Sequence, residues 1–139
     1  MVAVDERTGQ VSVLRYAVAH EGGEEINPQV VEGQIIGGVA QGIGGALLEQ
    51  FSYGEDGQPK STTFADYLLP GPLEVPRVDV RHLLVPTPDN PLGVRGVGES
   101  GTIAAAATLA AAIDDALDGQ VHVSQTPVSP AALKAVLTR

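Results

Sequence analysis

The sequence contains no cysteine. Disulfides, thiolate zinc sites and iron–sulfur clusters all need cysteine sulfur, so the chain forms none of them from its own residues. Its three histidines, His20, His82 and His122, are too widely spaced to place two imidazoles on one metal ion by a short motif. We therefore expect no metal site made of protein ligands alone, and each histidine is interpreted as a satisfied surface or core imidazole.

Basic residues are scarce, and long apolar runs are absent. The chain has eight Lys and Arg against 17 Asp and Glu, which gives a formal net charge of −9. Nucleic-acid binding needs clustered positive charge, so no nucleic-acid partner is expected. No segment approaches the roughly 20 apolar residues that span a bilayer, and the first residues lack a signal-peptide pattern. These absences predict no membrane association and a cytoplasmic location.

A length of 139 residues with 43% hydrophobic content is sufficient for one core, and residues 1–139 are interpreted as a single domain. Residues 2–4 and 11–19 are β-rich and flank a polar turn with Gly9, which predicts an opening hairpin. Asn27 followed by Pro28 is a typical helix start. The apolar residues that follow recur every four positions from Val31 to Phe51, which predicts one long helix.

The second half of the chain mixes short strands with helices. We expect strands at residues 62–64 and 78–85, an Ala-rich helix over residues 100–117 and a last short helix over residues 130–137. Because strands and helices do not alternate strictly, the predicted class is α+β. In that architecture an antiparallel or mixed sheet packs against two main helices.

The first helix contains an unusual number of glycines. Five lie between Ile35 and Leu48, and each costs about 1 kcal/mol relative to alanine in a helix interior. One explanation is a face of small residues against which another helix packs. The other is a cofactor cradle, in which Gln41, the only polar side chain of this interval, donates hydrogen bonds beside Gly42. The sequence leaves both open.

A second glycine-rich segment runs from Gly93 directly into the Ala-rich helix. Its backbone N–H groups and the helix dipole favour an anion site. Gly96, Gly98 and Gly101 match the spacing of a dinucleotide-binding loop, but they follow a proline-rich segment instead of a strand, so this match is weak. Glu99 is either an ordinary first-turn carboxylate or a base that faces a reacting group.

These two segments resemble the molybdenum-hydroxylase large subunits of the xanthine dehydrogenase, aldehyde oxidase and carbon monoxide dehydrogenase family. Residues 90–101 (Asn-Pro-Leu-Gly-Val-Arg-Gly-Val-Gly-Glu-Ser-Gly) are similar to the signature at the end of those subunits. Residues 31–44 (Val-Glu-Gly-Gln-Ile-Ile-Gly-Gly-Val-Ala-Gln-Gly-Ile-Gly) are similar to their upstream Gln-Gly helix. Residues 26–28 and 64–70 and the opening hairpin also fit, so the resemblance covers nearly the whole chain.

The resemblance implies that the chain is the carboxy-terminal part of a molybdopterin-binding domain. It implies that Glu99 is the active-site base. The cofactor would be molybdopterin with molybdenum, in its cytosine dinucleotide form, bound only in the assembled enzyme and not by the isolated chain. The implied cofactor-binding residues are Gln41, Gly42, Gly96, Val97, Gly98 and Ser100.

The implied partners are the remainder of the molybdenum-binding subunit and the iron–sulfur and FAD subunits of a holoenzyme. This chain departs from the family pattern where relatives usually have Asp-Cys-Gly-Arg, because it has Glu21-Gly22-Gly23-Glu24, and Arg95 stands where Lys is common. The chain is also several times shorter than such a subunit. We therefore expect a fragment or a separately encoded subunit that is inactive alone.

Two other functions remain compatible with the residues. The chain could be a non-enzymatic remnant or assembly module whose small-residue helices pack against a partner or self-associate. It could also be a small dinucleotide-binding protein, which requires a parallel strand leading straight into Gly96. The substrate is not encoded in any motif that we identify.

Overall fold

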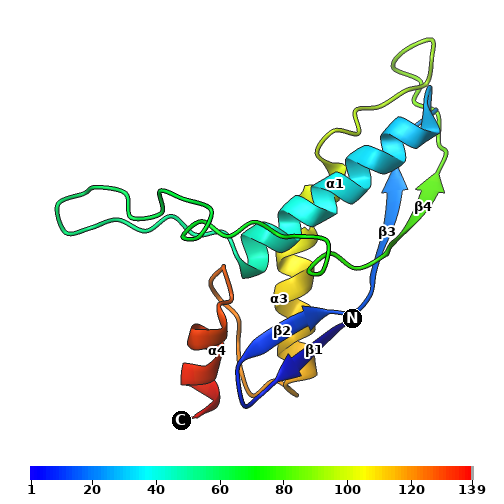
Figure 1. Ribbon diagram of the computed structural model, residues 1–139. Helices are drawn as coiled ribbons and strands as arrows, with labels where there is room; N and C mark the ends of the chain where they lie inside the picture. The colour runs from blue at the N-terminus through cyan, green and yellow to red at the C-terminus, as the bar shows by residue number, and fades with distance from the viewer. Residues whose placement is uncertain (139) are drawn as a thin grey trace.

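The computed structural model describes residues 1–138, so Arg139, the last residue of the predicted domain, lies outside the described part (Figure 1). The chain opens with strand β1 (Val2–Asp5) and strand β2 (Gln10–Val13), which pair antiparallel with Val2 opposite Val13. Gly9 supplies the positive φ of +77° that the turn needs. The predicted hairpin is confirmed.

The β-rich stretch of residues 11–19 is divided between two sheets instead of forming one strand. After β2 the chain turns at Leu14 and continues as β3 (Tyr16–Glu21), which pairs in parallel with β4 (Val78–Leu83). The β-rich composition of residues 11–19 continues on both sides of the break, so composition does not reveal it. The class prediction, α+β with a sheet of mixed character, is confirmed, with the strands arranged as two two-stranded sheets.

Helix α1 (Pro28–Leu47) joins the parallel strands and begins as predicted, with the Asn27 side chain accepting a hydrogen bond of 3.2 Å from the Val30 N–H. Its buried stripe includes Val31, Ile35, Val39 and Ile43. The helix ends four residues before Phe51, which lies exposed on the segment that follows, so the predicted end was too late.

A long excursion, residues 48–77, separates α1 from β4 and projects away from the rest of the molecule; we call it the arm (Figure 1). The strand expected at residues 62–64 is not formed. The Thr63 hydroxyl instead donates to Asp66 at 2.8 Å and accepts from the Ala65 N–H at 3.2 Å, so side chain to backbone bonds make a local turn there.

The Ala-rich segment folds as α2 (Ser100–Ile103) and α3 (Ala105–Ala116), with a break at Ala104, instead of one continuous helix. The last helix, α4 (Pro130–Leu137), has the predicted bounds, and the Ser129 side chain caps it by accepting from the Ala132 N–H at 3.2 Å.

Two buried clusters hold these elements together. One joins α1, α3 and the parallel strands, and the other joins α3 to α4 and the hairpin. The members of the first cluster are Tyr16, Val39, Ile43, Ala46, Val78, Ala105 and Leu109. The members of the second are Ile113, Leu117, Val121, Val128 and Leu133. Among residues 1–138, no helix is long and apolar enough to cross a membrane.

Candidate functional site

The two glycine-rich segments meet where α1 packs against α2. A side chain on Gly101 would collide with the Ile35 carbonyl oxygen, and a Cβ on Gly38 would stand 2.9 Å from the Gly101 Cα. The Thr102 hydroxyl donates a 3.0 Å hydrogen bond to the Gly38 carbonyl. The backbones of α1 and α2 are in direct contact here, and only glycine on both sides permits so short a separation.

One turn further along α1, Gly42 lies buried against Ala105, and a Cβ at Gly42 would overlap the Ala105 methyl group. The packing explanation for the helical glycines is therefore confirmed at Gly38 and Gly42. Gly45, which lies seven positions after Gly38 on the same strip of glycines, faces open space. The strip is not continuous, because α3 covers only part of it.

Gln41 is exposed on the flank of this contact. It follows Gly38 by three positions, which places it about 60° from Gly38 around the helix. Backbone N–H groups inside α1 donate to carbonyls four residues earlier, so a bound group finds its hydrogen-bond donor in the Gln41 side chain and not in the helix backbone. The Gly42 N–H belongs to that internal ladder.

The segment that leads into α2 rests on the end of β3. The Arg95 N–H donates to the Gly22 carbonyl at 2.9 Å, and Gly23 bridges to Val94. Gly23 has a φ of +68°, and a side chain there would collide with the Gly93 carbonyl. The Arg95 guanidinium also lies 3.2 Å from the Glu21 carboxylate. Residues 21–24 thus form the support of the loop.

The loop itself leaves donors free. Within residues 1–138, the backbone N–H groups of the four residues before α2, Gly96 to Glu99, donate no hydrogen bond to backbone or side chain. Gly96 and Gly98 are exposed, and a Cβ on either would meet open space. Val97 and Ser100 are half-buried, and the Ser100 hydroxyl donates to the Val97 carbonyl at 3.0 Å. Unpartnered amides on an accessible glycine loop fit an anionic or oxygen-rich ligand.

Glu99 occupies the cap position before α2, yet its side chain accepts no capping hydrogen bond and is exposed. In the sequence, Glu99 comes just before Gly101, and Gln41 comes just after Gly38 on α1. The two residues therefore flank the contact between Gly38 and Gly101 along their own segments. The interpretation of Glu99 as an ordinary first-turn carboxylate rests on the helix dipole and not on a cap hydrogen bond, so it stays a prediction. The carboxylate is available to a group outside the described chain.

His20 is a residue that sequence reasoning misjudged. It was expected to be a satisfied imidazole, but it is buried and its Nε2 has no hydrogen-bond partner among the described residues. A Cβ on Gly22 would lie 2.5 Å from that nitrogen and 3.0 Å from the Val97 Cγ1. Only the three-dimensional contact of β3 with the loop reveals this, because nothing in the spacing of His20, Gly22 and Val97 signals it.

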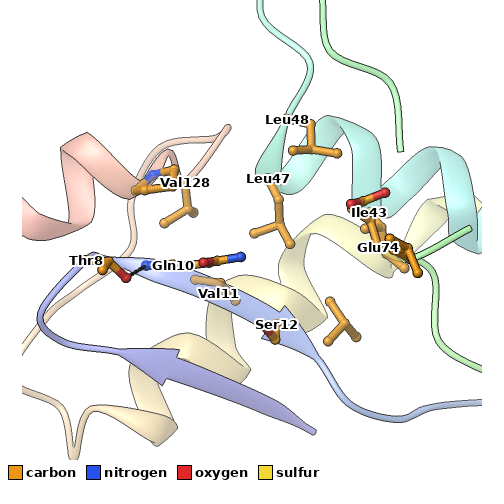
Figure 2. A pocket seen from close by; sticks show the side chains of 12 residues that line it. Thr8, Gln10, Val11, Ser12, Ile43, Leu47, Leu48, Glu74 and Val128 are labelled. Carbon is orange, nitrogen blue, oxygen red and sulfur yellow. Dashed lines mark hydrogen bonds between the residues drawn. The ribbon is translucent and has the colours of Figure 1, made fainter. Parts of the chain in front are cut away.

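A cavity lies elsewhere in the fold. A pocket of about 340 Å³ opens between the hairpin, the last turn of α1 and the base of the arm, and Figure 2 shows Leu47 and Leu48 facing Gln10 and Val128 across it. Glu99 and Gln41 do not line it. The accessible loop before α2 is therefore a better candidate for the functional site than this pocket, because the loop carries the free hydrogen-bond donors and the carboxylate.

Residues 1–138 hold no cluster of three or more His, Asp or Glu suited to a metal ion. The geometry also tests the dinucleotide-binding alternative. The dinucleotide-binding interpretation needs a strand that runs straight into the glycine loop, but β4 ends at Leu83 and an irregular segment precedes Gly96. That interpretation was wrong.

Comparisons with known proteins agree with one another. A family model for a molybdopterin cofactor-binding domain matches residues 1–76. The 6-hydroxypseudooxynicotine dehydrogenase complex subunit gamma of Paenarthrobacter nicotinovorans is 50% identical over 130 residues, which is 93% of this chain and 16% of that protein. The carbon monoxide dehydrogenase large chain of Hydrogenophaga pseudoflava is 35% identical over 126 residues, 91% of this chain and 15% of its own length.

Among solved structures, quinoline 2-oxidoreductase from Pseudomonas putida 86 matches with a TM-score of 0.94 and 40% identity, over 98% of this chain and 17% of that one. The likeness extends well beyond residue 76 and includes the region of Glu99, because a coverage of 98% leaves no room to omit it. The chain spans about one sixth of the length of these relatives.

Proposed function

Because the chain belongs to the family of molybdenum-hydroxylase large subunits, which carries the molybdopterin cofactor-binding domain, we propose that it completes the active site of such an enzyme. In this proposal residues 1–139 are the carboxy-terminal part of the molybdopterin-binding domain. Glu99 is the general base. Gln41, Gly42 and the loop from Gly96 to Ser100 form one wall of the cofactor site.

The observation that carries this proposal is the loop before α2, where an exposed carboxylate adjoins a run of unpartnered backbone N–H groups. The N–H groups and the Gln41 amide would donate to the oxygens of molybdopterin, in its cytosine dinucleotide form. When bound, that cofactor would supply the redox centre that takes up the electrons of the substrate oxidation. Glu99 would hold a proton at its carboxylate during oxygen insertion.

The remaining walls would come from other polypeptide. A ligand of this size is buried to about 70–90% of its surface in a typical site, and one loop and one helix flank do not provide that. The proposed partners are the remainder of the molybdenum-binding subunit and, in a holoenzyme, iron–sulfur and FAD subunits. Activity and cofactor binding therefore belong to the complex and not to the separate chain.

Replacement of Glu99 by Gln in the assembled enzyme tests the base. We expect kcat to fall by about 10²–10⁴ while the molybdenum content per complex stays unchanged, because the amide keeps the size of the side chain and removes its basicity. Glu6→Gln in the exposed hairpin turn is the matched control and should leave kcat unaltered. Normal turnover in Glu99→Gln would refute the assignment.

The native mass and metal content of the chain, purified gently from its host, test the need for a complex. Molybdenum in a complex much larger than 14.3 kDa is the expected result. A metal-free monomer, or a metal-free assembly of this chain alone, would instead support the non-enzymatic packing module.

A further inference from the structure

His20, near the end of β3, carries a buried ring nitrogen without a hydrogen-bond partner. The residue is 6% exposed, and its Nε2 is the one buried side-chain nitrogen or oxygen among residues 1–138 that lacks a partner. Burying a polar atom without a hydrogen bond costs free energy, so such atoms in native proteins are nearly always paired. The nitrogen therefore marks a contact that this conformation of the chain leaves open.

The charged groups around His20 already have partners of their own. Glu21, the next residue, lies 3.2 Å from the Arg95 guanidinium. His82, which stands opposite His20 in the parallel ladder, pairs through its Nδ1 with the Glu25 carboxylate. Both carboxylates therefore serve other side chains and not His20.

The Nε2 of His20 borders the loop before α2. A Cβ built on Gly22 would lie 2.5 Å from this nitrogen and 3.0 Å from the Val97 Cγ1. The edge of the imidazole and the Val97 side chain thus border the same small space. Because Gly22 has no side chain, the ring comes close to the loop without a clash.

This loop supplies the kind of group that the Nε2 lacks. The backbone N–H groups of residues 96–99 donate no hydrogen bond within residues 1–138. A neutral imidazole with its proton on Nδ1 has an acceptor at Nε2, which is complementary to an amide donor. The buried acceptor and the free donors of the adjoining loop are therefore suited to form one hydrogen bond with each other.

We propose that His20 is a positioning residue for Glu99. In the assembled enzyme its Nε2 accepts a hydrogen bond from an N–H of residues 96–99 and thereby fixes the loop. Glu99 follows Val97 by two positions, so a shift of the loop at Val97 displaces the carboxylate. The other free N–H groups of the loop stay available to the cofactor. This inference rests on the proposed function, because Glu99 needs a fixed position only if it acts on a bound group.

The test compares His20→Gln with His20→Met in the assembled holoenzyme. The two new side chains have the same length, but glutamine ends in an amide that accepts a hydrogen bond and methionine ends in a methyl group. We expect His20→Met to lower kcat by about 10–100-fold with KM and molybdenum content unchanged, because a misplacement of about 1 Å is sufficient for such a loss. His20→Gln should recover most of that kcat. His122→Met, at an exposed histidine beyond α3, is the matched control and should leave kcat unaltered.

Hydrogen exchange of the same variants gives a readout that does not depend on turnover. A peptide that spans residues 96–99 should exchange faster in His20→Met than in His20→Gln, since an amide that donates a hydrogen bond is protected from exchange. Cofactor bound at equal occupancy protects the loop equally in both variants, so the difference reports on residue 20. If His20→Met fails to assemble, His20→Asn takes its place, because the asparagine amide is one carbon shorter than that of glutamine.

Three outcomes would overturn the proposal. Equal losses of kcat in the Gln and Met variants would identify packing as the role of the ring. Unchanged kcat and exchange in His20→Met would remove any role, and loss of molybdenum from that variant would assign His20 to cofactor retention. Each can occur while Glu99→Gln still abolishes turnover, so this inference fails separately. If Glu99→Gln turned over normally, the exchange measurement would still decide whether His20 binds the loop.

Discussion

Gly42 lies so close to Ala105 that a methyl group added to it would overlap the Ala105 side chain. Overpacking of a helix contact costs about 1–3 kcal/mol, so Gly42→Ala should lower the free energy of unfolding of the free chain by that amount. Gly45→Ala is the matched control on the same helix, because its position faces open space.

For Gly45→Ala we expect a gain of up to about 1 kcal/mol from helix propensity. Urea unfolding at constant m-value measures both variants. Shifts of the same sign would show that the contact between α1 and α3 does not limit residue size at position 42.

Gln41 provides a separate test of the cofactor wall. Because the side chain is exposed, Gln41→Ala should leave the unfolding transition of the free chain unchanged. In the assembled enzyme it should lower the molybdenum and pterin content per complex, since one hydrogen-bond donor to the cofactor is lost. Gln120→Ala, an exposed glutamine beyond α3, should have neither effect. Full cofactor occupancy in Gln41→Ala would count against the role.

Gly22 and His20 should be energetically coupled. A methyl group at Gly22 would stand 2.5 Å from the His20 Nε2, so Gly22→Ala should destabilise the free chain, and less so when His20 is also replaced by Ala. The coupling of such neighbours is about 0.5–3 kcal/mol in a double-mutant cycle. Additive effects would mean that the ring of His20 moves aside at no cost.

The ion pair of Arg15 and Asp79 sets an acid-dependent contribution to folding. The Arg15 side chain donates to the Asp79 carboxylate, and this hydrogen bond lowers the pKa of Asp79 below its usual value. A lowered folded-state pKa stabilises the chain above the unfolded-state pKa of about 3.9 and loses that effect as the pH falls through the folded-state value.

Arg15→Ala should therefore raise the pKa of Asp79 and move the acid-unfolding midpoint to higher pH. An NMR titration of the Asp79 carboxyl carbon measures the first effect directly. Arg77→Ala is the comparison variant, since Arg77 lies 3.9 Å from the carboxylate and contributes less to the shift than Arg15. Equal effects of the two variants would contradict the dominant role of the hydrogen bond from Arg15.

Local chemistry made several elements predictable. Asn27 with Pro28 and Ser129 with Pro130 begin helices where caps and proline require them, and the stripe from Val31 to Ile43 is buried as its spacing predicts. The parallel pairing of β3 with β4 was not predictable, because strands so far apart in the sequence carry no local signal of their partner. The break at Ala104 was not predictable either, because the alanines on both sides of it favour helix.

The candidate site was predictable only where local sequence determines it. The glycine loop and Glu99 were found from their position before a helix, but the support beneath them, made of Gly22 and His20, depends on contacts across the fold. Asp114, near the end of α3, accepts a hydrogen bond from the Val123 N–H at 2.8 Å and holds the loop that follows α3. Side chains that bind distant backbone leave no trace in sequence periodicity.

The parallel pairing of β3 with β4 also determines how the chain reaches its folded state. Arg15, just before β3, and Asp79, within β4, are 64 positions apart, so the pairing closes a loop that includes the whole of α1 and the arm. Loop-closure entropy is lost before such distant contacts stabilise anything, whereas the hairpin and α1 need only neighbouring residues. The hairpin and α1 should therefore form early and the ladder late, with the loop that carries Glu99 settling last, on the strand end that supports it.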